Sequence, residues 1–405
     1  MDMREIKGME IAQNANIRRV SSGWLVPSQS THKIYTVRFD SHGASCTCPD
    51  CEIRKTKRCK HIIAVEIFMK QETDSEGNRT VTKAVRITYP QDWKSYNASQ
   101  TSEIEMFDVL LKDLVQSVPK PMQTFGRPRL NLQENLFCCI QKVYSQLSQR
   151  RAHTLYRNAQ EREQITHAPH FNAVGKLLNS KDLTPVLQRL LSISGLPLKS
   201  VEETFAIDSS GFRTTQFNQY AIEKYGMRKH HKWMKGHILV GTKTNVIASA
   251  RITDEFGADI KQFEPMVMEA HQSGFEMQEI VADKAYSSRD CYHIARDVGA
   301  TAYIPFKKNT RGKAEGSILW SKMFRYFQFR REEFLEHYHK RSNVESVFMM
   351  VKAKFGDRLK SKNPTAQENE LLCKFIAHNI VVLIHEVHEL GIAPHFPQED
   401  RKISL

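Results

Sequence analysis

The pattern of hydrophobic and polar positions changes three times along the chain. In the first 72 residues, Trp24–Val26 and Ile34–Phe39 alternate apolar and polar side chains, which predicts two short strands. A mostly apolar segment from about Lys60 to Lys70 predicts a short helix after them. Residues 73–102 are polar and weakly patterned, so we expect a linker there.

Residues 103–200 are expected to be helical. Hydrophobic side chains recur at helical spacing in two series: Ile104, Phe107, Val109–Leu111 and Leu114, then Leu136, Ile140, Val143 and Leu147. The segment 141–163 carries five Lys or Arg residues against two Glu. We therefore expect this region to bind DNA, although an ordinary solvated helix face explains the same charges at least as well.

Strand-like and helix-like segments alternate from residue 201 to about 395. The expected strands are Thr204–Asp208, His237–Lys243, Val246–Ile252, Glu279–Asp283 and Thr301–Phe306. The expected helices are Phe263–Gln272, Asp290–Val298, Ile318–Phe329, Glu332–Phe355 and Gln367–Leu390. Three consecutive strands followed by alternating helices and strands predict an α/β fold with a mixed sheet and helices on its faces.

Composition adds a class of partner to this picture. The chain has 405 residues, enough for two or three domains, and a formal net charge of +14. Such a charge is typical of proteins that bind nucleic acid, with a ribosome-associated or merely basic enzyme as the alternative. The longest apolar stretch, Phe375–Val387, is interrupted by polar residues and too short for a membrane span. With no signal peptide evident, the expected location is the cytoplasm or nucleoid.

Four of the eight cysteines lie within residues 46–59. They include the pair Cys46 and Cys48, and Cys59 with His61 forms a second pair ten residues later. Three thiolates and one imidazole suit tetrahedral zinc, so we expect a structural Zn²⁺ bound by these two pairs. Cys51 is a fifth candidate ligand inside the loop between them. Redox-active cysteines or a chance cluster are the alternative.

The cysteine cluster and its surroundings resemble the SWIM-type zinc finger, whose pattern is C-x-C, a variable gap and C-x-H. The resemblance covers residues 17–70 and includes Pro49 after the second cysteine and the apolar run Ile62–Val65 after the histidine. It implies a metal-stabilised unit at residues 1–72 that contacts either DNA or another protein.

Two aspartates are expected at the ends of apolar strands. Asp208 ends the strand that begins at Thr204, with Gly211 expected to break it, and Asp283 ends the strand that begins at Glu279. Sites in open α/β sheets gather at the carboxyl ends of strands, which makes both aspartates candidate catalytic residues. Taken singly, each is explained as well by a role in capping a turn or helix.

The expected helix Glu332–Phe355 has an apolar face and, beside it, a polar stripe. The stripe holds a phenol, two cations and a carboxylate within roughly 60° around the helix axis: Tyr338, Arg341, Glu345 and Lys352. A ladder of surface ion pairs is the alternative. However, Arg341 and Glu345 stand in the less favourable order for a simple i,i+4 pair, which favours a functional site.

These four residues match the Tyr-x2-Arg-x3-Glu-x6-Lys signature of insertion-sequence transposases of the DDE type, and residues 165–390 resemble that family. The resemblance implies a ribonuclease-H-like catalytic domain at residues 201–395, in which Asp208, Asp283 and Glu345 bind the catalytic metal ions. One departure is Ala285, where the family more often has glycine. The resemblance further implies cleavage of transposon ends, strand transfer into target DNA and a homodimer at synapsis.

The chemistry of phosphodiester cleavage explains the need for three carboxylates. Two Mg²⁺ or Mn²⁺ ions about 3.5–4 Å apart activate the attacking oxygen and neutralise the phosphate, and such hard cations prefer carboxylate oxygens. The cationic and aromatic side chains nearby are expected to bind DNA: Tyr338, Arg341, Lys352 and Lys354. The alternatives are a nuclease that cuts without joining, and a zinc-finger DNA-binding protein whose catalytic domain is a relic.

Overall fold

The chain forms two compact units, Met1–Gln91 and Asp92–Leu405, each with its own hydrophobic core. The computed structural model describes residues 3–20, 23–28, 33–40, 43–52, 58–69, 72–73, 79–80, 92–120, 130–214, 233–313 and 316–397.

The N-terminal unit contains a four-stranded antiparallel sheet whose strands follow chain order: β1 Arg18–Val20, β2 Gly23–Pro27, β3 Ile34–Asp40 and β4 Gly43–Cys46. The other elements are α1 Met3–Asn14, α2 Pro49–Glu52, α3 Lys60–Met69, β5 Glu72–Thr73 and β6 Arg79–Thr80. Both expected strands and the expected helix are therefore confirmed, whereas α1 was not expected. Gly8 lets α1 pack closely on α3, because a Cβ atom there would lie 2.7 Å from the Ile63 side chain.

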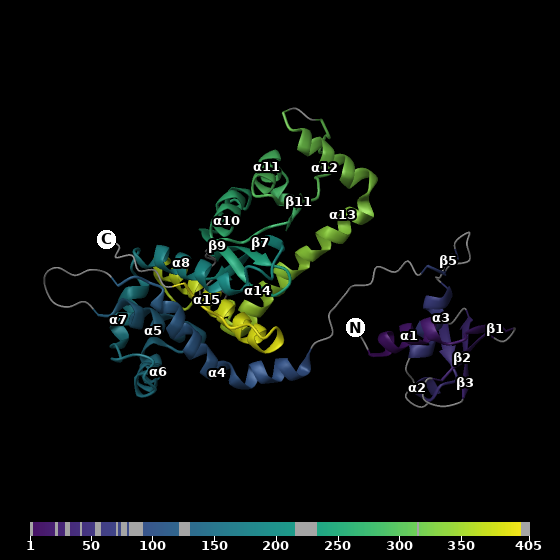
Figure 1. Ribbon diagram of the computed structural model, residues 1–405, viewed down its shortest axis with the longest axis horizontal. Coiled ribbons are helices and arrows are strands. Elements are labelled where there is room, and N and C mark those ends of the chain that lie inside the picture. Colours follow the sequence, from purple (N-terminus) through teal and green to yellow (C-terminus); the bar gives the residue numbers. More distant parts are fainter. Residues whose placement is uncertain are drawn as a thin grey trace, which may run out of the picture. The chain divides into compact units, whose positions relative to one another are not determined.

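The C-terminal unit is built around a five-stranded mixed sheet in the order β11–β10–β7–β8–β9 (Figure 1). The strands are β7 Thr204–Arg213, β8 Trp233–Gly241, β9 Ile247–Asp254, β10 Glu279–Ala282 and β11 Thr301–Tyr303. β7, β8 and β9 pair antiparallel, whereas β10 and β11 run parallel to β7. Parallel pairing requires crossovers, and the helices α10 Ile260–Gln272 and α11 Arg289–Asp297 lie in them. The expected α/β fold, a mixed sheet flanked by helices, is confirmed.

The expectation that Gly211 ends the first strand was wrong. β7 continues to Arg213 and pairs with β8 along this whole length, with Asp208 opposite Ile238 and Gly211 opposite Lys235. Gly211 instead permits close packing, since a Cβ atom there would lie 3.2 Å from the Trp233 ring. Asp208 is consequently held within a strand and does not lie at a chain turn.

Helices cover both faces of this sheet. Side chains alternate along a strand, so Asp208 and Phe212 project from the same face of β7. Two helices pack on that face: α14 Ser342–Phe355 and α15 Pro364–Glu389. The Phe212 ring contacts Phe348 from α14 and Phe375 from α15. In Figure 1, α10 and α11 lie on the other side of the strands from α14 and α15.

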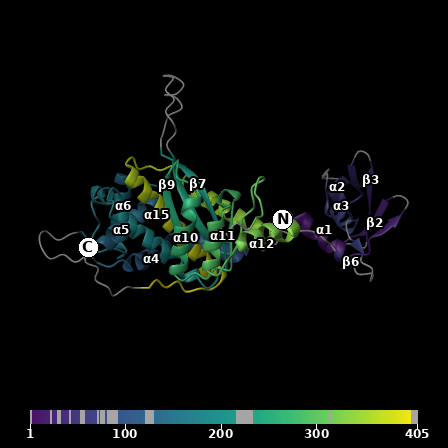
Figure 2. The same cartoon turned by 90° about the horizontal axis from the view of Figure 1, so that it is seen from above.

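The helical region and the sheet share one hydrophobic core. The helices of this region are α4 Trp93–Gln116, α5 Leu132–Tyr144, α6 Gln149–Glu161, α7 Phe171–Leu178 and α8 Leu183–Gly195, followed by the 3₁₀ turn η1 Leu196–Leu198. They gather with α15 on one side of the strands, as Figure 2 shows. The expected segments 103–200 and 201–395 are thus parts of one packed unit. α4 begins at Trp93, so residues 93–102 are helical where a linker was expected.

α15 connects these parts because it packs against α4, α5 and α8 and also reaches the sheet. By length and composition alone it could cross a membrane, but it is mostly buried inside the unit. Its polar side chains have partners there. Asn379 accepts a hydrogen bond from Ile247 N at 2.9 Å and donates one to Ile247 O at 2.8 Å. Asn369 donates to Leu178 O and Ser180 O, both at 3.0 Å, so α15 has the role of a core helix.

Candidate functional site

The register of the sheet brings Asp208 and Asp283 to neighbouring positions. Ile207 of β7 pairs with Ala282 of β10 across the parallel strands, so each strand continues directly into one of the two aspartates. Adjacent strands lie about 4.8 Å apart, which places the two carboxylates side by side where β10 ends. The two residues are 75 positions apart in the sequence and meet only through this pairing.

Asp283 also has the capping role that was its alternative interpretation. Its Oδ1 accepts a hydrogen bond from Ala285 N at 3.1 Å and so caps the 3₁₀ turn η2 Lys284–Tyr286. The Tyr286 side chain is buried below this turn. A carboxylate has two oxygens, each with more than one acceptor position, so capping and metal binding are compatible at Asp283.

Glu345 lies on α14, after an interruption that the sequence pattern did not predict. The expected continuous helix Glu332–Phe355 is divided into α13 Arg331–Tyr338, the 3₁₀ turn η3 His339–Arg341 and α14. A 3₁₀ turn advances by three residues per turn, so the single polar stripe expected from uniform α-helical steps is not maintained. Contact between its members is retained, because the Arg341 guanidinium lies 6.0 Å from the centre of the Tyr338 ring.

The guanidinium of Arg341 joins two of the three candidate carboxylates. Arg341 Nη1 lies 2.7 Å from Asp208 Oδ2, and Arg341 Nη2 pairs with Glu345 Oε1. The Arg341 and Asp208 side chains are 18% and 23% exposed, whereas that of Glu345 is 58% exposed. One partly buried cation therefore offsets the repulsion between carboxylates that come from different elements.

The protonation equilibria of these groups are coupled. Burial raises the pKa of Asp208, and the negative charges of Asp283 and Glu345 raise it further. The hydrogen bond from a backbone N–H and the charge of the neighbouring guanidinium act in the opposite direction and lower it. Burial acts to lower the pKa of Arg341, but Tyr338 and the three carboxylates outweigh it, so this pKa is raised. The carboxylates thus share one electrostatic environment, as a cation-binding site requires.

Asp208 and Glu345 line an open pocket together with Lys352 and the exposed side chain of Met349. Lys352 Nζ donates to Ser210 Oγ at 2.7 Å, and burial lowers the pKa of Lys352. Ser210 projects from the same face of β7 as Asp208, two residues further along. Sequence reasoning missed Ser210 because β7 was expected to end at Asp208.

Lys354 does not join this pocket. Its Nζ pairs with Glu103 Oε2 of α4 at 2.7 Å, and the Glu103 side chain is only 9% exposed. The hydroxyl of Tyr144 donates to the other oxygen of Glu103 at 2.5 Å. Lys360, six residues further along the chain, donates to Gln146 O. Both lysines therefore face the helical region, which differs from the expectation that Lys354 binds DNA.

The cysteine cluster forms a compact donor set in the N-terminal unit. The Sγ atoms of Cys46, Cys48, Cys51 and Cys59 all lie within 4.8 Å of one another. His61 Nδ1 lies 4.0 Å from Cys59 Sγ. Bond lengths of about 2.0–2.3 Å to zinc place two ligands of one tetrahedral ion roughly 3.5–4 Å apart, so both contacts are compatible with a metal centre. The structure therefore adds Cys51 to the donors expected from the outer pairs.

Among the described residues, the buried cluster contains a nitrogen atom without a hydrogen-bond partner and a pair of interacting thiols. His61 is buried beside the Tyr35 ring, and His61 Nε2 has no hydrogen-bond partner within the described residues. A hydrogen bond with Cys46 lowers the pKa of Cys59, and the same contact raises the pKa of Cys46. A thiol with a lowered pKa beside an imidazole nitrogen is a pair of donors that suits zinc.

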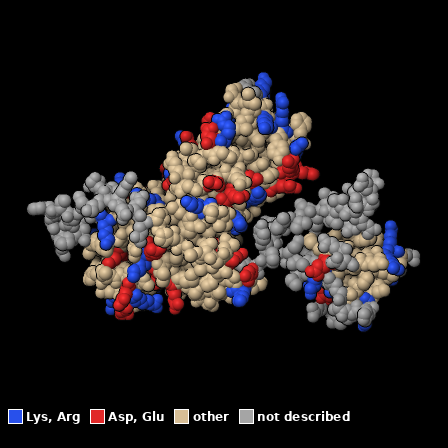
Figure 3. Space-filling model, viewed as in Figure 1, with Lys and Arg blue, Asp and Glu red and all other residues tan. Residues whose placement is uncertain are grey.

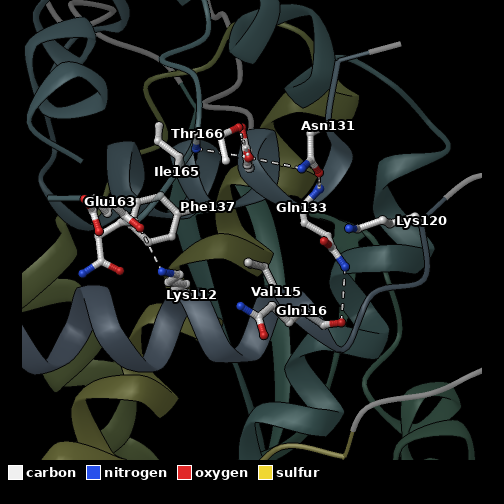
Figure 4. A pocket seen from close by; sticks show the side chains of 12 residues that line it. Lys112, Val115, Gln116, Lys120, Asn131, Gln133, Phe137, Glu163, Ile165 and Thr166 are labelled. Atoms are coloured by element: carbon white, nitrogen blue, oxygen red, sulfur yellow. Dashed lines mark hydrogen bonds between the residues drawn. The ribbon is translucent and has the colours of Figure 1, made fainter. Parts of the chain in front are cut away.

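A separate polar pocket lies in the helical region (Figure 4). Lys112 Nζ donates to Glu163 O at 2.9 Å, and Thr166 Oγ1 donates to Glu134 Oε1 at 2.7 Å. All of its lining residues lie in the region 103–200 that was expected to bind DNA, and none of them is near the candidate carboxylates in the sequence. The pocket alone does not show what it binds. DNA binding by residues 103–200 consequently stays a prediction.

Comparison with known proteins adds one sequence match and one structural similarity. Residues 199–380, which include Asp208, Asp283 and Glu345, match the protein family described as Transposase DDE domain. Among solved structures, the chain is similar to the piggyBac transposase in its synaptic complex with hairpin DNA, determined by cryo-electron microscopy. That similarity has a TM-score of 0.35 and 10% sequence identity, and it covers 74% of this chain and 76% of the other.

Proposed function

We propose that this chain is a DNA transposase, which cleaves DNA at transposon ends and joins the freed 3′-hydroxyl to target DNA. The observation that carries the proposal is that Arg341 joins Asp208 of β7 to Glu345 of α14, while strand pairing makes Asp283, at the end of β10, the neighbour of Asp208. The match of residues 199–380 to the Transposase DDE domain family supports it. The net charge of +14 supports DNA as the partner.

The carboxylates fit Mg²⁺ or Mn²⁺, because hard divalent cations prefer oxygen ligands. Asp208, Asp283 and Glu345 would hold two ions. The positive charge of the ions would offset both the burial of Asp208, which is the main cause of its raised pKa, and the smaller effect of the neighbouring carboxylates. When bound, the ions would supply activation of the attacking oxygen and stabilisation of the leaving oxygen.

The side chains around the carboxylates would position the DNA backbone. Arg341 pairs with both Asp208 and Glu345, so its guanidinium is placed to bind a phosphate oxygen next to the metal ligands. Lys352, held by Ser210 in the same pocket, provides a second cation for the backbone. Tyr338 lies against the Arg341 guanidinium and limits its movement.

In the N-terminal unit, we propose a structural Zn²⁺ bound by Cys46, Cys48, Cys59 and His61. The position of His61 Nδ1, 4.0 Å from Cys59 Sγ, supports a ligand role for the imidazole, and Cys51 remains the competing fourth donor. The zinc would stabilise this unit, whose small core is separate from that of residues 92–405. The unit would contact DNA or a protein partner.

Transposition also requires two DNA ends to be held together. A homodimer with one carboxylate site on each end is therefore part of the proposal, as is a location with access to DNA, in the cytoplasm or nucleoid.

The proposal is tested by incubating the protein and Mg²⁺ with duplexes that carry the terminal inverted repeats flanking its gene. We expect both cleavage at the repeat and covalent joining of the processed 3′-end to a target plasmid. Asp297→Asn, which changes an exposed carboxylate of α11, is the control and should retain both activities. Cleavage without joined product would replace the transposase by a nuclease that uses the same site.

A further inference from the structure

A second pocket near the end of β10 carries positive charge that the carboxylate site does not use. It lies between the start of α11, the loop that follows β11 and the first turn of α12 Ile318–Phe329. The charged side chains that line it among the described residues are Arg289, Arg311, Lys313 and Asp290. Three positive charges and one negative charge leave the lining with a net charge of +2. In Figure 3, Lys and Arg side chains are prominent on the end of the unit that contains α11 and α12.

The backbone around this pocket is held in place by its own contacts. Trp320 Nε1 donates to Arg311 O at 3.1 Å, and Arg289 Nη2 donates to Lys313 O at 3.5 Å. The Arg289 guanidinium also lies 5.5 Å from the centre of the Trp320 ring. These contacts use the backbone of the loop and leave the side chains of Arg311 and Lys313 exposed. Neither of the two side chains has an ion-pair partner in the described parts of the chain.

The pocket is close to the carboxylates along the chain. Arg289 follows Asp283 by six residues, and an extended chain covers at most roughly 3.3–3.6 Å per residue, so their Cα atoms lie within about 20 Å. A DNA strand rises about 3.4 Å per nucleotide along the duplex axis. A duplex whose cut phosphate lies at the carboxylates could thus place a phosphate within roughly six nucleotides of the cut over this pocket.

We propose that this pocket binds a backbone phosphate of the DNA strand, within about six nucleotides of the phosphate that is cut. The inference rests on the proposed function, because it takes DNA as the ligand. Two exposed cations, Arg311 and Lys313, provide charged hydrogen-bond donors for phosphate oxygens. The contacts of Trp320 and Arg289 with their carbonyl oxygens hold the backbone of both residues in place. The start of α11 adds a partial positive charge. This second contact would orient the strand relative to Asp283.

The first test measures the salt dependence of binding to a random-sequence duplex. We expect Arg311→Gln/Lys313→Gln to weaken binding about tenfold near 0.1 M salt and to reduce the slope of log K against log salt by about one or two. The matched control is Lys322→Gln/Arg325→Gln, which removes one Lys and one Arg from the exposed face of α12. If the two double variants weaken DNA binding equally, the proposed phosphate site is contradicted, and the loss reflects only the general positive charge of the protein.

The second test uses repeat-end duplexes in which single phosphates near the cut are replaced by neutral methylphosphonates. In the wild type, we expect one replacement within about six nucleotides of the cut to weaken binding about tenfold. The same replacement should have little effect in Arg311→Gln/Lys313→Gln, since the contact is already lost. If each single-phosphate replacement weakens both proteins equally, the pocket does not bind the backbone.

The proposed function and the phosphate-binding pocket can be tested separately, because the two tests of the pocket measure DNA binding and need no cleavage. If the wild type binds DNA but never cuts it, the proposed function is contradicted. The coupling between phosphate and side chains, measured by comparing the phosphate replacements in the wild type and in Arg311→Gln/Lys313→Gln, would still show whether the pocket binds the DNA backbone. A wild type that cuts DNA but shows no coupling contradicts the pocket alone.

Discussion

Arg341 Nη1 lies 2.7 Å from Asp208 Oδ2, across 133 positions of sequence. This ion pair joins the last residue of a 3₁₀ turn to a residue inside the central strand of the sheet. Because the same guanidinium also pairs with Glu345, it determines how α14 is placed relative to Asp208. Arg341 is thus both a structural counter-ion of the carboxylates and a candidate ligand for the DNA backbone.

Replacing Arg341 with methionine should destabilise the metal-free protein. Asp208 and Glu345 would lose their shared cation, and we expect the free energy of unfolding to fall by about 1–2 kcal/mol. The loss is smaller than for a fully buried pair because the Glu345 side chain is 58% exposed. Urea unfolding with and without Mn²⁺ measures the effect. Mn²⁺ should stabilise Arg341→Met more than the wild type, and equal stabilisation of both would contradict the counter-ion role.

Lys352 and Lys354 are two residues apart and should respond oppositely to the same change. Lys354→Met leaves the nearly buried Glu103 without its cation and should lower the free energy of unfolding by about 2–3 kcal/mol. Lys352→Met should cost less than about 1 kcal/mol, because its amine is bonded to the Ser210 hydroxyl, but should slow DNA cleavage at least tenfold. Urea unfolding and initial cleavage rates on the same preparations compare the two. If Lys354→Met is as stable as the wild type but cleaves DNA more slowly, Lys354 binds DNA as the sequence predicted, and its structural role is contradicted.

Acid should destabilise the C-terminal unit through buried histidines. Burial lowers the pKa of His378 from 6.5 to about 4, and burial has the same effect on His237. Between these values the unfolded chain binds a proton that the folded chain does not, so stability falls as the pH drops from about 6.5 to about 4. The loss approaches about 3 kcal/mol for each histidine.

His378→Gln tests this linkage, because its amide can still donate to Asn245 O, the acceptor of His378 Nε2 at 3.0 Å. Stability measured by urea unfolding across this pH range should depend less steeply on pH in the variant. The control is His395→Gln, which changes an exposed histidine and should leave the wild-type slope. Indistinguishable slopes for His378→Gln and the wild type would show that His378 is not the titrating group.

Chelation should unfold the N-terminal unit alone, because its core is separate from that of residues 92–405. Calorimetry should show the loss of one thermal transition and retention of the other. Cys59→Ser should abolish zinc binding and have the same effect. Cys51→Ser should retain one zinc per chain, whereas His61→Ala should lose it. If Cys51→Ser loses zinc and His61→Ala retains it, Cys51 is the fourth ligand. Unchanged melting after exhaustive chelation would contradict the assignment of a zinc centre.

The succession of strands and helices along the C-terminal half of the chain could be predicted from the sequence, because it depends on local pattern. The candidate carboxylates followed from their positions in these elements together with the family resemblance. Apolar runs that lead into Asp208 and Asp283 indicate strands, and parallel pairing then brings their ends together. The spacing of Arg341 and Glu345 places them near one another on any helix-like backbone, so their contact is retained across the turn η3.

The remaining features depend on contacts between distant residues, which local pattern does not contain. Gly211 was expected to end β7, but continuous pairing with β8 keeps the strand intact to Arg213. Lys354 was expected to bind DNA because local pattern does not reveal its ion-pair partner, Glu103, which lies 251 positions away. The buried face of α15 is not purely apolar in sequence, because it includes Asn369 and Asn379. Both side chains are buried and form hydrogen bonds with residues of other elements.

The metal-dependent rate of DNA cleavage tests the central claim most directly. Asp208→Asn, Asp283→Asn and Glu345→Gln each keep the side-chain shape but remove the charge that holds the metal ions. With repeat-end duplexes and Mg²⁺, we expect each variant to cut at least a hundredfold more slowly than the wild type and the Asp297→Asn control. Cleavage by a folded Asp283→Asn at the wild-type rate would contradict the account.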